Sequence, residues 1–161
     1  MPKISFAEFD SAHAAPVAEI CLAHGNKPDH LLEILHDVQG KLGHVPQEVL
    51  PIIAKALNLS RAEVHGVVTF YHDYHQHPTG KHVIKICRAE ACQSAGGFAV
   101  IAALEKATGT KLGETSADGR FTLEAVYCLG LCPMGPAALI DGKPVAAIKP
   151  KKVDALVKEL A

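Results

Sequence analysis

The sequence contains no tryptophan, and aromatic residues make up only 5% of its 161 positions. Its core must therefore be built mainly from aliphatic side chains. No uninterrupted apolar run approaches the ~20 residues that a membrane-spanning helix needs. Glu8 and Asp10 interrupt the start of the chain before an apolar signal region can form. We therefore expect a cytoplasmic protein, and no direct insertion into a membrane.

Neither sign of charge dominates, since 16 Lys and Arg residues face 17 Asp and Glu residues. Without a basic stripe, the chain is not expected to bind nucleic acid. A G-x-G-x-x-G motif is absent, and the GETS segment at 113–116 lacks the glycines and lysine of a phosphate-binding loop. The chain is therefore not expected to bind a nicotinamide dinucleotide by itself.

The first half of the sequence has the periodicity of amphipathic helices. Ser60 and Glu63 form the pattern of a capping box, and Asp29 is a candidate cap further upstream. Apolar positions recur three and four residues apart, as on the buried face of a helix. Four helices are predicted, at about residues 16–24, 29–43, 47–57 and 60–71.

After residue 78, the helical periodicity gives way to a pattern of strands and helices. Residues 82–87 (HVIKIC) and 121–127 (FTLEAVY) read as strands, with a helix over 96–108 between them. A strand–helix–strand crossover makes those strands parallel, and a hairpin around Asp141-Gly142-Lys143 adds antiparallel strands. The fold class is therefore α/β: a helical bundle at 1–78, then a thioredoxin-like domain at 79–161 with a four-stranded mixed sheet and a final helix.

Four of the five cysteines occur in two pairs, Cys87 with Cys92 and Cys128 with Cys132. Cys87 ends the first predicted strand, and Cys128 follows the second. The carboxyl ends of parallel strands meet at one edge of a sheet, where α/β folds place ligands. The four thiols are therefore expected to converge, whereas Cys21 reads as a small buried hydrophobic residue on a helix.

Several kinds of site could use four convergent thiols. Zinc and iron–sulfur clusters both accept four thiolates, and a dithiol redox site is a third possibility. Zinc knuckles usually place two residues between their cysteines, whereas the spacings here are four and three. The wider loops favour a [2Fe–2S] cluster, with Gly96, Gly97, Gly130 and Gly135 letting the backbone approach the sulfurs.

Three long segments resemble the thioredoxin-like [2Fe–2S] subunit family of respiratory complex I, the NuoE family. They are GHVPQEVLPIIAKALNLSRAEVHGVVTFYHDY, PTGKHVIKICRAEAC and GETSADGRFTLEAVYCLGLCPMGPAALI. The resemblance covers about residues 30–150 and includes the C-x₄-C…C-x₃-C pattern. It implies one [2Fe–2S] cluster with Cys87, Cys92, Cys128 and Cys132 as its ligands.

The resemblance also implies a role and partners. Members of this family carry electrons beside a larger subunit that binds flavin and NAD, so FMN, NAD and any molybdenum cofactor are expected only on partner subunits. The chain would then have no substrate site, and its helical segment would be a docking element. The CRAEACQ segment and the short N-terminus resemble the gamma subunit of molybdenum-dependent, NAD-dependent formate dehydrogenase. The alternatives are the equivalent subunit of complex I or of an NAD-reducing hydrogenase, a free-standing redox protein, and a zinc-stabilised interaction module.

Two further features need an interpretation. Histidines crowd residues 72–82, at His72, His75, His77 and His82, with a spacing that fits no compact set of metal ligands. We expect a surface or a subunit contact there. Met134 occupies a position that varies within the family, and could touch the surroundings of the cluster without binding it.

Overall fold

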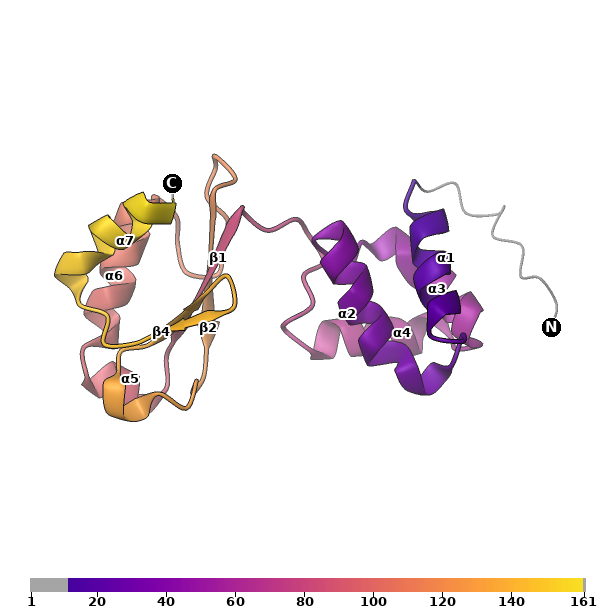
Figure 1. Ribbon diagram of the computed structural model, residues 1–161, viewed down its shortest axis with the longest axis horizontal. Coiled ribbons are helices and arrows are strands. Elements are labelled where there is room, and N and C mark those ends of the chain that lie inside the picture. The colour runs from indigo at the N-terminus through magenta and orange to yellow at the C-terminus, as the bar shows by residue number, and fades with distance from the viewer. Residues whose placement is uncertain (1–11, 161) are drawn as a thin grey trace. The chain divides into compact units, whose positions relative to one another are not determined.

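The computed structural model describes residues 12–160, and the chain divides into two compact units between Pro78 and Thr79 (Figure 1). Each unit has a hydrophobic core of its own. In the described part of the chain, no helix is both long enough and apolar enough to cross a membrane.

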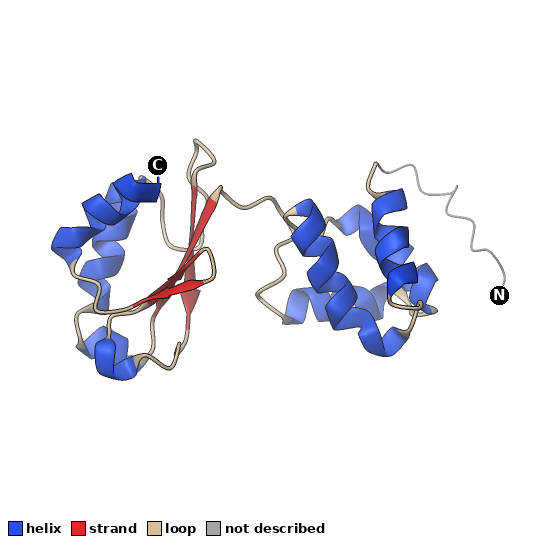
Figure 2. Cartoon of the chain, in the orientation of Figure 1, coloured by secondary structure: helices blue, strands red, loops and turns tan. Residues whose placement is uncertain are grey.

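Over residues 12–78, helices are the only regular secondary structure of the first unit (Figure 2). Its four α-helices are α1 (Ala14–Ala23), α2 (Leu31–Leu42), α3 (Leu50–Leu57) and α4 (Arg61–Phe70). Short 3₁₀ turns, Pro28–His30 and Gln47–Val49, lead into α2 and α3. The four predicted helices are therefore present, and each of the last two predicted spans includes a 3₁₀ turn or a capping residue at its start.

Local sequence accounts for some of these helix ends. The Ser60 hydroxyl accepts a hydrogen bond from the Glu63 N–H, and the Glu63 carboxylate accepts one from the Ser60 N–H, which completes the predicted capping box. Gly43 ends α2 with a φ of 79°. The prediction for Asp29 was wrong. It lies inside the first 3₁₀ turn, and the residue that precedes α2 is His30, whose side chain makes no capping hydrogen bond.

Aliphatic side chains fill the core between these helices, as the lack of tryptophan requires. Helix α3 is the most deeply buried, because it packs against both α1 and α4. The largest fully buried side chains of this unit are Val17, Ile34, Leu35, Leu50, Ile52, Ile53 and Leu57. Burying each such side chain contributes roughly 1.5–3 kcal/mol.

The second unit is a four-stranded mixed sheet with helices. Its strands are β1 (His82–Cys87), β2 (Phe121–Val126), β3 (Ala138–Ile140) and β4 (Lys143–Val145), and its helices are α5 (Glu90–Ser94), α6 (Gly97–Thr108) and α7 (Val153–Leu160). The strand order is β2-β1-β3-β4. β1 and β2 are parallel, and β3 and β4 form the antiparallel hairpin, as predicted.

Helices α6 and α7 pack against each other beside the sheet (Figure 1). Ile84 and Ile86 of β1 lie in one cluster with Val100 and Leu104 of α6. Alternation along β1 sends Lys85 to the opposite face of the sheet, where its ammonium group lies 3.5 Å from the Glu124 carboxylate of β2. This sheet therefore determines where the two loops that carry the paired cysteines begin.

Strand β4 is short and ends at Val145. Ala147 has a φ of 52°, which is rare for a residue with a side chain and turns the backbone out of the strand. Its N–H then donates to the Met134 carbonyl at 2.7 Å, and the Ile148 N–H donates to Pro136. The residues after β4 therefore hold the loop that carries Cys132.

Candidate metal centre

Two loops that leave the same edge of the sheet carry the four paired cysteines. Cys87 is the last residue of β1, and its register partner on β2 is Val126, two residues before Cys128. Cys92 lies in α5, and Cys132 begins a 3₁₀ turn, Cys132–Met134. The short helix α5 packs against that turn, so the two loops meet.

The thiols form two pairs that face each other. The sulfurs of Cys128 and Cys132 lie 3.8 Å apart, and the Cys87 and Cys92 thiols share a hydrogen bond. The pairs also interact electrostatically, because a negative charge on Cys87 raises the pKa of both Cys92 and Cys132. The structure therefore pairs Cys87 with Cys92 and Cys128 with Cys132, and it places the two pairs close enough to interact electrostatically.

Backbone N–H groups surround the Cys87 sulfur. Burial by itself would raise the pKa of this thiol. Hydrogen bonds from the Ala89 N–H, from the Cys92 thiol and from the Cys128 and Leu129 N–H groups together outweigh burial and hold the pKa of Cys87 below its usual value. Cys128 has a φ of 63°, and the successive N–H groups of residues 128 and 129 form the kind of concavity that binds anions. These contacts therefore favour the negatively charged thiolate of Cys87 over its neutral thiol.

The pKa values of Cys92 and Cys132 are shifted in the opposite direction. Burial, and then the neighbouring Cys87, raise the pKa of Cys92. The hydrogen bond with Cys128, followed by the charge of Cys128, raises the pKa of Cys132. Four thiolates close together would repel one another, and a bound metal centre would compensate their charge.

Two of the four glycines singled out from the sequence make room for this site. A Cβ on Gly97 would lie 2.7 Å from the Cys92 carbonyl oxygen, and one on Gly135 would lie 3.3 Å from the Cys92 sulfur. Gly96 and Gly130 instead adopt positive φ angles and have open space around them. Side chains at Gly97 or Gly135 would displace Cys92.

The chemistry of this donor set fits a [2Fe–2S] cluster. Such a cluster takes four thiolates, two at each iron, and the structure offers two sulfur pairs. A single zinc ion would need three or four ligands around one point. Among the described residues, no group of three or more His, Cys, Asp or Glu side chains is arranged to hold one metal ion.

Cys21 and the histidines that the sequence singled out lie outside the two cysteine loops, whereas Met134 lies at the end of the Cys132 turn. Cys21 is fully buried in the core of the helical unit, where desolvation raises the pKa of its thiol to about 11. His82 Nδ1 lies 2.7 Å from the Asp141 carboxylate, and His75 is tied through its backbone N–H to the Gln39 side chain. Met134 is 53% exposed at the end of the Cys132 turn.

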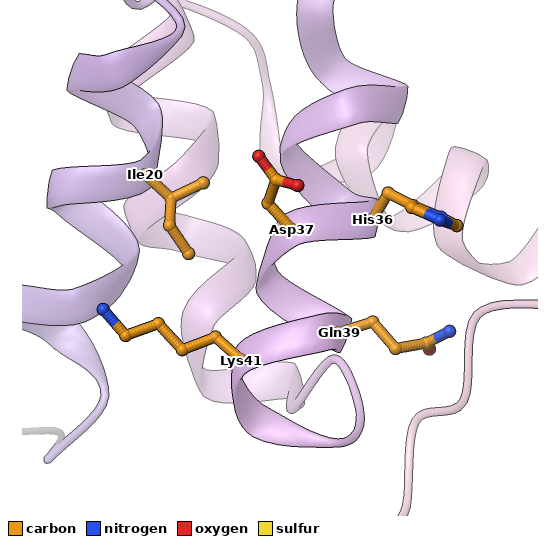
Figure 3. Close-up of a pocket in the computed structure, with 6 residues that line it drawn as sticks. Ile20, His36, Asp37, Gln39 and Lys41 are labelled. Carbon is orange, nitrogen blue, oxygen red and sulfur yellow. The ribbon is translucent and has the colours of Figure 1, made fainter.

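A shallow surface pocket of about 580 Å³ lies on the helical unit (Figure 3). Three of its polar side chains, Asp37, Gln39 and Lys41, are already engaged. The Asp37 carboxylate lies 2.7 Å from His24 Nε2, the Lys41 ammonium lies 3.8 Å from Glu19, and the Gln39 amide donates to the Asp73 carbonyl. These contacts hold the helical unit together, and no set of polar groups converges on a ligand.

The chain matches the model of the thioredoxin-like [2Fe–2S] ferredoxin family over residues 17–161. It is 38% identical over 127 residues to a subunit of NADH-quinone oxidoreductase from Pseudomonas aeruginosa, covering 79% of this chain and 76% of the relative. The chain belongs to the thioredoxin-like [2Fe–2S] ferredoxin family. This membership confirms the predicted fold class and the predicted [2Fe–2S] cofactor.

Other relatives of this ferredoxin-family chain occur inside longer polypeptides. It is 37% identical over 130 residues to the alpha subunit of the NAD-reducing hydrogenase HoxS of Cupriavidus necator, covering 81% of this chain but 22% of the relative. A solved NAD⁺-reducing [NiFe]-hydrogenase matches with a TM-score of 0.71 and 28% identity, over 81% of this chain and 22% of that one. The chain therefore spans about a fifth of these hydrogenase subunits.

Proposed function

We propose that the chain is an electron-transfer subunit of an NAD-linked oxidoreductase, in which Cys87, Cys92, Cys128 and Cys132 bind the [2Fe–2S] cluster. The observation that carries this proposal is the convergence of two thiol pairs from parallel strand ends. When bound, such a cluster accepts and releases one electron at a time. The chain itself would anchor the cluster through the four sulfurs, and orient N–H groups of residues 89, 128 and 129 toward Cys87.

The proposal assigns the hydride chemistry to a partner. NAD(H) exchanges two electrons together as a hydride, whereas this cluster takes one, so a flavin has to divide the pair. The family's relatives include subunits of NADH-quinone oxidoreductase and of NAD-reducing hydrogenases. We therefore expect a neighbouring subunit that binds FMN and NAD, and no substrate site on this chain.

The finer proposal is that the complex is a soluble, molybdenum-dependent formate dehydrogenase. It is supported by the likeness of the CRAEACQ segment to the gamma subunit of such enzymes, with the molybdenum cofactor on a third subunit. Complex I and an NAD-reducing hydrogenase are the alternatives that the relatives favour. The complex that co-purifies with the chain should reduce NAD⁺ with formate. Activity with hydrogen or with quinone instead would overturn this assignment.

We also propose a cytoplasmic location. The five cysteines are free thiols in the structure, and four of them have to stay reduced to bind iron. Reducing compartments keep thiols in that state. Fractionation of the cells should recover the chain in the cytoplasm, and recovery from an oxidising compartment would contradict this.

The isolated chain, loaded with its cluster, should not be reduced by NADH. After the flavin-binding subunit is added under anaerobic conditions, NADH should bleach the visible absorption of the cluster and produce the paramagnetic resonance signal of a reduced [2Fe–2S] centre. The flavin-binding subunit alone, with NADH, is the control for flavin bleaching. If the cluster potential lies below that of NADH, dithionite and a redox titration give the potential directly.

Rapid reduction of the isolated chain by NADH would contradict the proposed carrier role. It would mean that the chain holds a dinucleotide site. A cluster that dithionite reduces, but that no combination of flavin-binding subunit and NADH reduces despite a suitable potential, would contradict the proposed partner.

A further inference from the structure

The peptide group between Arg88 and Ala89, in the first cysteine loop, makes a hydrogen bond at each of its ends. Its N–H, which belongs to Ala89, donates to the Cys87 sulfur. Its carbonyl oxygen, which belongs to Arg88, accepts a hydrogen bond from the half-buried side-chain amide of Gln93 at 2.5 Å. One peptide group therefore joins the Gln93 amide to a proposed ligand of the cluster.

The geometry of a peptide bond couples these two hydrogen bonds. The Arg88–Ala89 bond is trans, so its C=O and N–H groups lie in one plane and point in opposite directions. A donor that holds the carbonyl oxygen on one side therefore aims the N–H toward the other side, where the Cys87 sulfur lies. Hydrogen bonds linked in this way also polarise one another, which strengthens each of them.

The backbone on either side of this peptide group is held by other contacts. The Arg88 N–H donates to the Val126 carbonyl of β2 at 2.7 Å. The Ala89 carbonyl accepts hydrogen bonds from the Cys92 and Gln93 N–H groups, both at 3.0 Å. A rotation of the peptide plane alone would keep these bonds while it turned the Ala89 N–H away from the sulfur. The Gln93 amide opposes that rotation, because the rotated carbonyl would lose its donor.

We propose that Gln93 is a positioning residue for the cluster, whose amide orients the Arg88–Ala89 peptide toward Cys87 and thereby raises the reduction potential. Reduction adds one negative charge to the cluster, and N–H groups that donate to a ligand sulfur stabilise the more negative state. The inference rests on the proposed function, because Cys87 is a ligand only within it. It adds a residue that touches neither the iron nor the sulfur.

The test measures the reduction potential of the full-length, cluster-loaded chain by anaerobic titration with dithionite, followed through the paramagnetic resonance signal of the reduced cluster. Gln93→Met keeps the length and helix propensity of the side chain but cannot donate a hydrogen bond. Ser94→Ala is the matched control on α5, because the Ser94 hydroxyl donates to the Ala91 carbonyl at 3.0 Å and not to the Arg88–Ala89 peptide. Iron and labile sulfide are measured in every variant.

Gln93→Met should lower the ratio of reduced to oxidised cluster at a fixed solution potential by about threefold to tenfold, where tenfold corresponds to about 59 mV for a one-electron couple. The effect is limited because the Ala89 N–H loses its orientation but is still present. Ser94→Ala should leave the ratio within about twofold, as for an ordinary surface change.

Ala89→Pro tests whether Gln93 acts through this N–H. Proline has no N–H, and the φ of −71° at Ala89 is one that proline adopts. Ala89→Pro should lower the ratio at least as much as Gln93→Met does. Adding Gln93→Met to Ala89→Pro should then change the ratio by less than about twofold, because the group that Gln93 orients is gone.

If Ala89→Pro does not assemble a cluster, the hyperfine coupling of exchangeable protons to the reduced cluster replaces that comparison. One such coupling should weaken in Gln93→Met and none in Ser94→Ala. Unchanged couplings would overturn the inference.

An unchanged potential in Gln93→Met would also overturn it, and so would equal effects of Gln93→Met with and without Ala89→Pro. Loss of iron from both Gln93→Met and Gln93→Leu would show that the side chain serves only to fold the loop, which contradicts the proposed role. Failure of the proposed function has a different signature, since the unaltered chain itself would then hold no [2Fe–2S] cluster.

Discussion

The [2Fe–2S] cluster should be lost when Cys128 is replaced by serine, and it should be retained when Cys21 is replaced by serine. A serine hydroxyl does not ionise near neutral pH, and its oxygen is a harder donor than the soft sulfur that iron–sulfur clusters use. With Cys128→Ser, the sulfur pair 3.8 Å apart would be reduced to one sulfur, which leaves one iron with a single thiolate. Bound iron should fall from about two per chain toward zero.

Cys21→Ser is the matched control because it makes the same chemical change at the remaining cysteine. Cys21 is buried in the helical core, and its thiol has a pKa of about 11 and no role at the sheet edge. Burying a hydroxyl there costs roughly 1–3 kcal/mol of stability in the helical unit. Iron content and the visible spectrum should nevertheless match those of the unaltered chain. Equal loss of iron in both variants would mean that the proposed ligand set is wrong.

Deletion of residues 1–78 is expected to leave the cluster intact and to abolish stable assembly with the flavin-binding subunit. All four paired cysteines, the sheet and its aliphatic core lie in the second unit, so residues 79–161 hold everything that the cluster site uses. The first unit has a separate core and exposes Leu22, Leu32, Phe70 and Tyr71, which are suited to a contact with a partner.

If the helical unit anchors the chain, the cluster-bearing unit meets the partner at a high effective concentration, and without that anchor it binds only weakly. Co-purification with the flavin-binding subunit measures assembly. The visible spectrum of the truncated chain measures whether its cluster is intact. A truncated chain that co-purifies as fully as the intact one would contradict the docking role of the helical unit.

The sequence predicted the architecture because its signals agree with one another. The capping box at Ser60, the β-branched run that ends at Cys87 and the hairpin signal at Asp141 each specify one local structure, and the parallel pairing of β1 and β2 follows from their order. The convergence of the four cysteines is a consequence of that pairing. Spacing alone left zinc open, and the family match decided the cofactor.

Other parts of the site could not be predicted. Helix α5 spans five residues, too few to show a period of 3.6, although it carries Cys92. Glycines were expected to bring backbone N–H groups to the sulfurs, but the donors to Cys87 are Ala89, Cys128 and Leu129. A cysteine with a φ of 63° has no signature in sequence, because the strain is maintained by tertiary contacts.

The difference in solvent exposure between the two cysteine pairs could not be predicted from the sequence either. Both pairs follow apolar strands, yet Cys87 and Cys92 are buried while Cys128 and Cys132 are exposed. The difference arises because α5 packs Cys92 inward, whereas the second loop returns along the surface to the residues after β4. Only the folded loops distinguish the two pairs.

The central claim, that four cysteines of this chain bind one [2Fe–2S] cluster, is tested most directly by the metal and sulfide content of the protein purified without oxygen. We expect about two iron atoms and about two acid-labile sulfides per chain, as this cluster type requires, in a coloured protein. A colourless chain with stoichiometric zinc and no labile sulfide would contradict the claim.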